Sequence, residues 1–222
     1  MNSPPPRDSR LATHDPLFVT FEGTEGSGKS EQARRLVDRL RARGISVVAT
    51  HEPGGTPLGS ELRQLILSRS ELQVTAKAEA LMLNASRCQL VHIVIKPALV
   101  CGDVVVCDRF ADSTLAYQGA GRGLDKHDLN SVISFATAGL QPDMTMLLDV
   151  PVEVGLARKR AQDEQNRFEA EALAFHARVR DAYRAMAESE PARWRCFNGV
   201  EAPERLEEQI WSAVAARMGL EP

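Results

Sequence analysis

The sequence lacks the features that mark membrane proteins and nucleic-acid-binding proteins. None of its apolar runs approaches the roughly 20 residues that a membrane-spanning helix needs, so we expect no membrane segment. The net charge of −3 provides no basic field that would attract a nucleic-acid backbone, which disfavours a polynucleotide partner. With 222 residues and 43% hydrophobic content, the chain is long enough to bury a full core. We therefore expect a soluble protein with one domain.

Paired cysteines and a signal peptide are also missing. The sequence has four cysteines: Cys88, Cys101, Cys107 and Cys196. None of them shows C-x-x-C spacing, which disfavours a disulfide framework or a zinc site and indicates buried thiols in a reducing compartment. Residues 1–16 contain three consecutive prolines and no apolar signal-peptide core. We predict that residues 1–16 are a disordered tail, that residues 17–222 form a single domain, and that the protein is cytoplasmic.

A phosphate-binding pattern lies near the start of the predicted domain. Residues 23–30 read G-T-E-G-S-G-K-S and match G-x-x-x-x-G-K-[ST]. The backbone N–H groups of such a loop and the following helix N-terminus surround phosphate groups. Lys29 can reach the β- and γ-phosphates, and the Ser30 hydroxyl can ligate magnesium. The residues predicted to bind ATP are Gly23, Thr24, Glu25, Gly26, Ser27, Gly28, Lys29 and Ser30.

The residues on both sides of this loop have the periodicity that the motif requires. Residues 17–21 form an apolar run typical of a buried strand, and residues 31–43 place Ala33, Leu36 and Val37 on one helical face. A glycine-rich surface turn is the alternative, but such a turn seldom has both flanks. The sequence therefore predicts a strand, a phosphate-binding loop and a helix in succession.

Apolar strands and amphipathic helices alternate along the rest of the chain. Further strands are expected at residues 45–50, 103–108, 144–149 and 194–198. Helices are expected at residues 57–68, 75–99, 126–137, 152–160, 169–187 and 203–217. Residues 110–123 contain three glycines, and we expect a loop or an irregular helix start there. This alternation predicts an α/β fold with a doubly wound parallel sheet, whose ligands bind at the carboxyl ends of the strands.

Two acids end apolar strands and are candidates to hold magnesium. Asp108 is followed by Arg109, which places an anion-binding group beside the metal acid, and we favour it. Asp149 is interpreted as an N-cap or an ion-pair acid that leads into the next helix. Arg63, Arg87, Arg109 and Arg122 are candidates for contacts to a second phosphate-bearing substrate. For Arg63 and Arg87 a surface charge on a helix is the alternative.

Four separated motifs together resemble the bacterial thymidylate kinases. They are the phosphate loop, E-P-G-G-T at residues 52–56, D-R at residues 108–109, and S-T-L-A-Y-Q-G-A-G-R-G at residues 113–123. The resemblance continues through L-L-D-V-P-V-E-V-G-L-A-R-K-R and N-R-F-E, and it covers nearly the whole chain after the tail. It implies the nucleoside monophosphate kinase fold of the P-loop NTPases, with a five-stranded parallel sheet, a mobile lid at about residues 158–167 and a homodimer.

The resemblance also implies an activity, which is the transfer of a phosphoryl group from ATP, with Mg²⁺, to dTMP. By this resemblance Glu25 lies near the sugar hydroxyl and the acceptor phosphate, and Arg63 and Arg109 hold the monophosphate. The implied substrate-binding residues are Glu25, Pro53, Arg63, Leu83, Arg87, Arg109, Ser113, Thr114 and Tyr117. Among them Arg87 and Thr114 would read the thymine edge, and Tyr117 would disfavour a 2′-hydroxyl. The implied catalytic residues are Lys29, Arg109, Arg158, Arg160 and Glu25, with Ser30 and Asp108 at the metal.

The sequence departs from this family pattern at four positions. Leu83 replaces the phenylalanine that commonly stacks on thymine, and it has no π-face. His51 replaces an arginine that often precedes E-P-G-G-T, and Gln162 replaces a basic residue of the lid. Gly26 takes the place of the arginine that some members carry in the phosphate loop. The transition-state charge must then be met from the lid, by Arg158, Arg160 or Arg167.

Other functions remain as alternatives. A kinase for another monophosphate, such as dUMP or CMP, is kept open by Leu83. A nucleotide-gated switch or an inactive binding module would also use a phosphate loop, but it would need no clamp for an acceptor phosphate. A GTPase would need a guanine-reading N-K-x-D sequence, which is absent.

Overall fold

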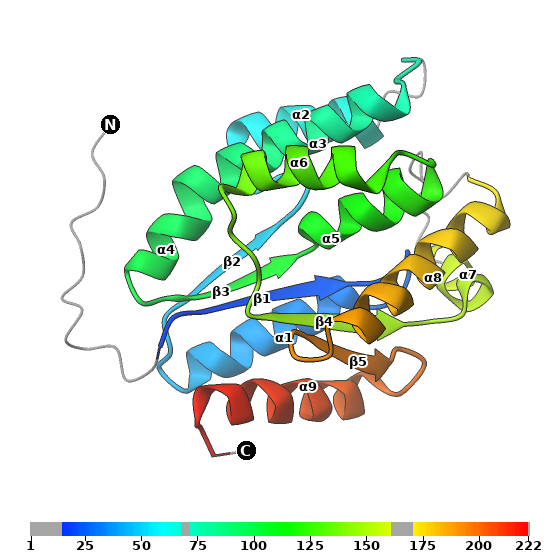
Figure 1. Ribbon diagram of the computed structural model, residues 1–222. Helices are drawn as coiled ribbons and strands as arrows, with labels where there is room; N and C mark the ends of the chain where they lie inside the picture. The colour runs from blue at the N-terminus through cyan, green and yellow to red at the C-terminus, as the bar shows by residue number, and fades with distance from the viewer. Residues whose placement is uncertain (1–14, 68–71, 161–170, 222) are drawn as a thin grey trace.

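A computed structural model describes residues 15–67, 72–160 and 171–221. Its centre is a five-stranded sheet in which every neighbouring pair of strands is parallel, with the order β2-β3-β1-β4-β5 (Figure 1). The strands are β1 (Leu17–Glu22), β2 (Val47–His51), β3 (Val104–Asp108), β4 (Met144–Asp149) and β5 (Trp194–Asn198). β3, β4 and β5 end at the predicted residues, and β2 begins two residues later than expected.

Alternate residues of β1 face opposite layers of helices. Leu17, Val19 and Phe21 pack with α1 (Lys29–Ala42) and α9 (Pro203–Met218). Phe18 faces the other side, where it packs against residues of the segment 90–110. This two-residue period is what a strand buried on both faces requires. By the same period Glu22 shares the Phe18 face.

The second face of the sheet is covered by helices from the middle of the chain, as Figure 1 shows. They are α2 (Pro57–Leu67), α3 (Ala76–Leu90), a π-helix (Val91–Ile95), α4 (Lys96–Val100), α5 (Ala111–Thr114), a second π-helix (Leu115–Gly121), α6 (Lys126–Thr137) and α8 (Leu173–Ser189). α7 (Val152–Arg160) instead packs against α8 and the phosphate loop. Helices on both faces confirm the doubly wound architecture. Among the described residues, no helix is long and apolar enough to cross a membrane.

Of the two alternatives predicted for residues 110–123, the loop is wrong, and an irregular helix is found. This segment is helical almost throughout, first as α5 and then as the second π-helix. The glycines favoured a loop, but Gly121 belongs to the second π-helix. A Cβ at this position would collide with the ring of Phe175, which explains why the residue is glycine. The glycine therefore permits close packing of α8 and makes no turn.

The apolar periodicity of residues 57–68 places Leu58 on one helical face, and that of residues 75–99 predicts Leu81 in the core, but both side chains are exposed. Leu58 is 48% exposed on α2, and Leu81 is 58% exposed on α3. Ile66 on α2 and Ala80 on α3 are buried, so each helix packs through other positions. The predicted tail, apart from its last two residues, and residues 161–167 of the predicted lid lie outside the described residues.

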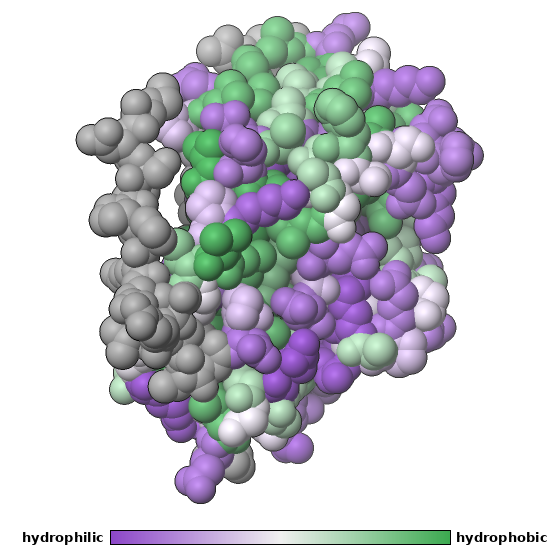
Figure 2. Space-filling model, turned by 60° about the vertical axis from the view of Figure 1, so that its left-hand side comes forward, coloured by the Kyte–Doolittle hydropathy of each residue, from purple (hydrophilic) through white to green (hydrophobic). Residues whose placement is uncertain are grey.

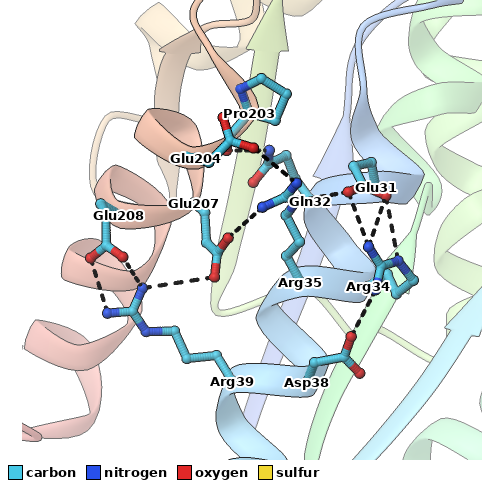
Figure 3. A network of polar contacts seen from close by, with 10 residues as sticks. All are labelled: Glu31, Gln32, Arg34, Arg35, Asp38, Arg39, Pro203, Glu204, Glu207 and Glu208. Atoms are coloured by element: carbon cyan, nitrogen blue, oxygen red, sulfur yellow. Dashed lines mark hydrogen bonds and ion pairs between the residues drawn. The ribbon is translucent and has the colours of Figure 1, made fainter.

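Ion pairs join α1 to α9 on the surface (Figure 3). Arg35 Nη1 lies 2.7 Å from Glu207 Oε2, and Arg39 Nη1 lies 2.6 Å from Glu208 Oε1. Gln32 donates from its amide to the Pro203 carbonyl at 2.9 Å, at the first residue of α9. The start of α9 is thereby fixed against the helix that follows the phosphate loop.

Candidate active site

A cavity of about 1220 Å³ opens at the carboxyl ends of β1, β2 and β3. Its lining includes most of the predicted site: residues 25–30, Pro53, Arg63, Leu83, Arg87, Asp108, Arg109, Ser113, Thr114, Tyr117 and Arg158. Gly23, Thr24 and Arg160 are not in the lining. The segments that follow three separate strands thus meet at one edge of the sheet, as expected for ligand binding by a parallel sheet.

The phosphate loop holds its lysine inside the loop itself. Lys29 Nζ donates to the Thr24 carbonyl at 2.7 Å and to Ser27 Oγ at 3.2 Å. Burial and the nearby charge of Arg109 lower the pKa of Lys29 to about 8. A bound phosphate would favour the charged ammonium again.

The loop also touches α7 through two glycines. A Cβ on Gly26, where φ is +66°, would collide with the Gly155 carbonyl. A Cβ on Gly155 would in turn collide with the Glu25 carbonyl. No side chain fits between the phosphate loop and the first turns of α7, which explains in this chain why glycine occupies position 26.

Ser30 and Asp108 lie together, as a shared metal site requires. The Ser30 hydroxyl donates to Asp108 Oδ2, and Asp108 Oδ1 is buried without a hydrogen-bond partner among the described residues. Two hard oxygen donors beside a phosphate loop fit Mg²⁺. The described residues contain no cluster of three or more His, Cys, Asp or Glu side chains, so phosphate and water oxygens would complete its coordination. Asp149 instead pairs with Arg180 at 2.6 and 2.9 Å, as the ion-pair interpretation predicts.

Arg109 is the centre of the cavity's polar contacts. Its backbone lies in the left-handed region with φ of 69°, which is uncommon for a residue with a side chain. Nη2 donates to the Tyr117 hydroxyl at 3.1 Å and approaches Glu25 Oε1 at 3.4 Å. Nη1 donates to Ser113 Oγ at 3.1 Å and to the Tyr183 hydroxyl at 3.2 Å. The guanidinium is therefore fixed before any ligand binds.

Glu25 is ionised beside this guanidinium. The Tyr117 hydroxyl donates to Glu25 Oε1 at 2.7 Å, and His176 Nδ1 lies 3.4 Å from Oε2. Burial alone would raise the pKa of Glu25, but the neighbouring His176, Arg109 and Lys29 outweigh it and hold the pKa at about 2. The carboxylate can accept a hydrogen bond from a ligand hydroxyl in this state.

Arg87 is buried and does not lie on the surface, which was the alternative for it. It is 2% exposed, its Nη2 lies 2.7 Å from Glu52 Oε2, and its Nη1 donates to Asn84 Oδ1 at 2.8 Å. Nη2 also donates to Thr114 Oγ1 at 3.0 Å. Burial raises the pKa of Glu52, and Arg87 opposes that shift. Arg87 and Thr114, the two residues predicted to contact the edge of the base, are therefore hydrogen bonded to each other.

The other predicted arginines differ in their surroundings. Arg63 is exposed at the cavity and donates to the Pro53 carbonyl at 3.0 Å. Arg122 lies outside the cavity lining and pairs with Glu171 at 2.6 Å, so it has a structural role. Arg158 donates to the Gly199 carbonyl at 2.8 Å and reaches the Gly26 carbonyl at 3.5 Å. Arg160 is exposed at the end of α7, and Arg167 and Gln162 lie outside the described residues.

The part of the cavity near Leu83, where the resemblance implies a base, has less aromatic surface than the family pattern implies. Leu83 lines it, as predicted, and Phe110 lies nearby beneath the Arg87 guanidinium, with 5.5 Å between the guanidinium carbon and the ring centroid. His51 also lines the cavity, and burial, followed by the charge of Arg63, lowers its pKa. His51 thus adds no permanent charge.

Sequence reasoning missed three buried polar residues at the site, namely Glu22, His176 and Tyr183. Each is at most 1% exposed. Tyr183 contacts Arg109 directly, whereas Glu22 and His176 each contact one of its partners. Glu22 gave one signal, since it is an acid at the end of an apolar strand on the Phe18 face. His176 and Tyr183 lie on the inner face of α8, where a buried side chain is the ordinary expectation.

Comparisons with known proteins agree with this geometry. The family model for thymidylate kinase matches residues 21–210. The chain belongs to the thymidylate kinase family. It is 49% identical to the thymidylate kinase of Thermomicrobium roseum over 90% of this chain and 95% of that protein. It is 45% identical to that of Deinococcus radiodurans over 90% of this chain and 97% of that protein.

A solved thymidylate kinase shares the fold. The crystal structure of the Ehrlichia chaffeensis thymidylate kinase superposes with a TM-score of 0.74 at 29% sequence identity, covering 90% of this chain and 99% of that one. The resemblance inferred from four motifs is therefore confirmed along nearly the whole chain. The predicted P-loop nucleoside monophosphate kinase fold is confirmed with it.

Proposed function

We propose that this protein is a dTMP kinase that transfers the γ-phosphoryl group of ATP to dTMP and forms dTDP and ADP. The observation that carries the proposal is the placement of two sets of cations around one cavity. Lys29 comes from the phosphate loop after β1, whereas Arg109 follows β3 and Arg87 lies on α3, and all three line the same cavity. Two mutually repelling anions can be held in line only by such an arrangement.

On the donor side, the phosphate loop supplies N–H groups and an ammonium. Lys29 bonds to neutral oxygens of its own loop, which a nucleotide phosphate can replace as a stronger, charged partner. Ser30 and Asp108 would hold Mg²⁺, which supplies positive charge to the transferred group when bound. Arg158 lies at the phosphate loop and is assigned to the same task, together with Arg160, which is two residues further along α7.

On the acceptor side, the proposal assigns the monophosphate to Arg109 and Arg63. The acceptor oxygen of a monophosphate is already ionised near neutral pH, so no strong general base is needed. The proposal assigns the sugar to Glu25 and Tyr117. The thymine base and the nucleotide phosphate are assigned to the remaining substrate-binding residues: Pro53, Leu83, Arg87, Ser113 and Thr114. Buried partners keep these groups in place, which reduces the cost of ordering them on binding.

The decisive experiment measures ADP release from MgATP with dTMP, dUMP, CMP, AMP and GMP offered separately. We expect turnover with dTMP to exceed turnover with the other acceptors. Turnover that does not depend on any acceptor would contradict the kinase proposal. Equal turnover with dTMP and CMP would contradict the specificity alone.

A second candidate acceptor is dUMP, and Leu83 favours it. A leucine packs against a base without the stacking that an aromatic ring adds, which is worth about 0.5–1.5 kcal/mol. If Leu83 weakens the preference for dTMP over dUMP, Leu83→Phe should raise the kcat/KM for dTMP relative to that for dUMP. An unchanged ratio would assign discrimination to other residues.

The proposal includes a homodimer. Exposed apolar side chains occur on neighbouring helices of one layer: Leu58 on α2, Leu81 on α3 and Phe135, which is 86% exposed, on α6. Figure 2 shows apolar surface more extensively in its upper half, where Figure 1 places these helices. Light scattering of the purified protein tests it, and Phe135→Glu should lower the measured mass.

A cytoplasmic location is also proposed, because all four cysteines are free thiols.

A further inference from the structure

Glu22 is a fully buried acid directly behind Arg109. It ends β1 and is 0% exposed, and it does not line the cavity. Its Oε1 accepts the backbone N–H of Phe110, the residue after Arg109, at 2.8 Å. Glu22 therefore holds the backbone that places Arg109 in its left-handed conformation.

The other carboxylate oxygen belongs to a triangle of three oxygens. Glu22 Oε2 lies 2.6 Å from Ser113 Oγ and 2.8 Å from the Tyr183 hydroxyl, and these two hydroxyls lie 2.8 Å from each other. Each side of the triangle has the length of a hydrogen bond, so three hydrogens are needed. The two hydroxyls supply only two of them. A proton on Glu22 supplies the third, and then each oxygen donates once around the ring.

Both hydroxyls of the triangle also touch the guanidinium. Arg109 Nη1 donates to Ser113 Oγ at 3.1 Å and to the Tyr183 hydroxyl at 3.2 Å. The triangle thus orients the Arg109 side chain, while Glu22 Oε1 orients its backbone. A neutral Glu22 leaves the charge of Arg109 available to a ligand, whereas an ionised Glu22 would attract it.

Several charged and titratable groups from different helices and strands surround Glu22 and influence its pKa. Burial and the negative charge of Asp112 raise the pKa of Glu22 to about 7, although Arg109 opposes them. Asp112 is itself paired with Arg193 at 2.6 Å, and Lys29 faces Glu22 from α1. Cys107 on β3 and Tyr183 on α8 also face it, and burial raises the pKa of both well above ordinary values, so both are neutral.

We infer that Glu22, Ser113 and Tyr183 form a proton-holding triad that positions Arg109 and takes up a proton when the acceptor phosphate binds. The inference deepens the proposed function, since it assigns the phosphate of dTMP to Arg109. An added negative charge on the far side of Arg109 favours the neutral form of Glu22. Glu22 is a positioning residue here, because it acts through Arg109 and does not touch the substrate.

Calorimetry of dTMP binding tests the proton uptake. Binding is measured at pH 8 in Tris and in HEPES, whose ionisation enthalpies differ, so that the difference in heat counts protons. The substrate phosphate is already ionised at this pH, since its second pKa is about 6. We expect wild type to take up a few tenths of a proton and Glu22→Gln, which mimics the neutral acid, to take up measurably less.

Lys29 is the competing source of uptake, because its pKa of about 8 also rises near a phosphate. Any uptake by Lys29 persists in Glu22→Gln. Equal uptake in wild type and Glu22→Gln would therefore overturn the inference. Glu79→Gln is the matched control, since it removes another fully buried carboxylate that bonds to Gln118, and it should keep the wild-type uptake.

The pH dependence of KM gives a kinetic readout that a purely structural role would not move. From pH 7 to pH 9 the KM for dTMP should rise in wild type as Glu22 ionises, while kcat at saturation changes less. In Glu22→Gln this rise in KM should be smaller. An identical pH profile in the two proteins would contradict the triad.

Carbon-13 NMR of the wild-type side-chain carboxyls tests the triad without any variant. The Glu22 resonance, assigned through its backbone, should titrate near neutral pH in the ligand-free protein. Saturation with dTMP should shift its midpoint upward. A midpoint below pH 5, or one that bound dTMP leaves in place, overturns the inference. A protein that binds no dTMP but titrates near neutral contradicts the proposed function and keeps the triad.

Discussion

The parts of the cavity that we propose for the acceptor and for the donor hold their cations in different ways. Arg87 and Arg109 on the acceptor side contact buried carboxylates and hydroxyls, among them Glu52 and Glu25. On the donor side, Lys29 and Arg158 bond to neutral backbone carbonyls, together with one serine hydroxyl. The bonds to Glu52 and Glu25 join two charged groups, whereas the bonds of Lys29 and Arg158 carry charge on the donor alone, so they give up no ion pair when a phosphate replaces the carbonyl.

This difference indicates which groups change partners during catalysis. The donor cations can leave neutral carbonyls for a phosphate without breaking an ion pair. The acceptor cations keep their carboxylate partners, so their geometry is set before the substrate arrives. We therefore expect changes on the donor side to affect kcat most, and changes on the acceptor side to affect stability and the KM for dTMP.

Replacing Lys29 should have the largest effect. In Lys29→Ala, kcat should fall about a thousandfold, because one positioned charge-stabilising donor is worth about 10²–10³ or more in rate. The melting temperature should change little, since Lys29 bonds only within its own loop. Lys126→Ala, an exposed lysine on α6, is the matched control and should keep full activity. A kcat of Lys29→Ala within tenfold of the wild-type value would contradict the assignment of Lys29 to the donor phosphates.

Breaking the Arg87–Glu52 pair should cost stability. Arg87→Met leaves a buried carboxylate without its partner, so urea unfolding should show a loss of about 3 kcal/mol. The double variant with Glu52→Gln should recover part of that loss. Arg35→Met, which removes the surface pair with Glu207 in Figure 3, should cost much less stability than Arg87→Met, because solvent screens exposed pairs. Equal losses in both single variants would contradict the special role of burial.

Two glutamates three residues apart should give opposite pH dependences of stability. The pKa of Glu22 is raised to about 7, so the folded state binds more protons and stability falls as pH rises from 4.5 to 7. The pKa of Glu25 is lowered to about 2, so stability falls as pH drops from 4.5 to 2. Each effect is on the order of 3 kcal/mol, since one pKa unit corresponds to about 1.4 kcal/mol. Urea unfolding across pH should lose the upper slope in Glu22→Gln and the lower slope in Glu25→Gln, and unchanged slopes would refute these assignments.

The arginines of α7 should show the smallest effects. Arg158→Ala and Arg160→Ala should each lower kcat by about tenfold, and the KM for dTMP should change less. Steady-state rates with varied dTMP at saturating ATP measure both quantities. A rise in KM with unchanged kcat would assign these residues to acceptor binding. The contrast between the two sides of the cavity would then fail.

Much of the fold followed from local patterns. The apolar runs of β3, β4 and β5 end at polar residues or at a glycine turn, so their ends could be predicted closely. The segment after Phe110 could be predicted only as a loop or an irregular helix start, because its glycines also fit a turn unless the packing of Phe175 is known. Leu81 could not be placed either, since periodicity defines a face and does not say what covers it.

The site was predicted in part for the same reason. Its motif residues lie at strand ends, and the sheet brings strand ends together, so the meeting of Ser30 with Asp108 could be expected. One partner of Arg109, Tyr183, comes from α8, more than sixty residues away in sequence, and no local pattern connects the two residues. Glu22 was visible as an acid at a strand end, but its burial depends on that distant helix.

The contact between Gly26 and Gly155 limits how the enzyme can be redesigned. A phosphate loop that carries arginine at position 26 cannot be grafted into this chain alone, because the first turns of α7 occupy that space. Residues 23–30 and 152–156 form one exchangeable unit. We expect a chimera that receives both segments from an arginine-bearing relative to fold, and one that receives the loop alone to misplace its own helix. Natural sequences that change one position should change the other with it.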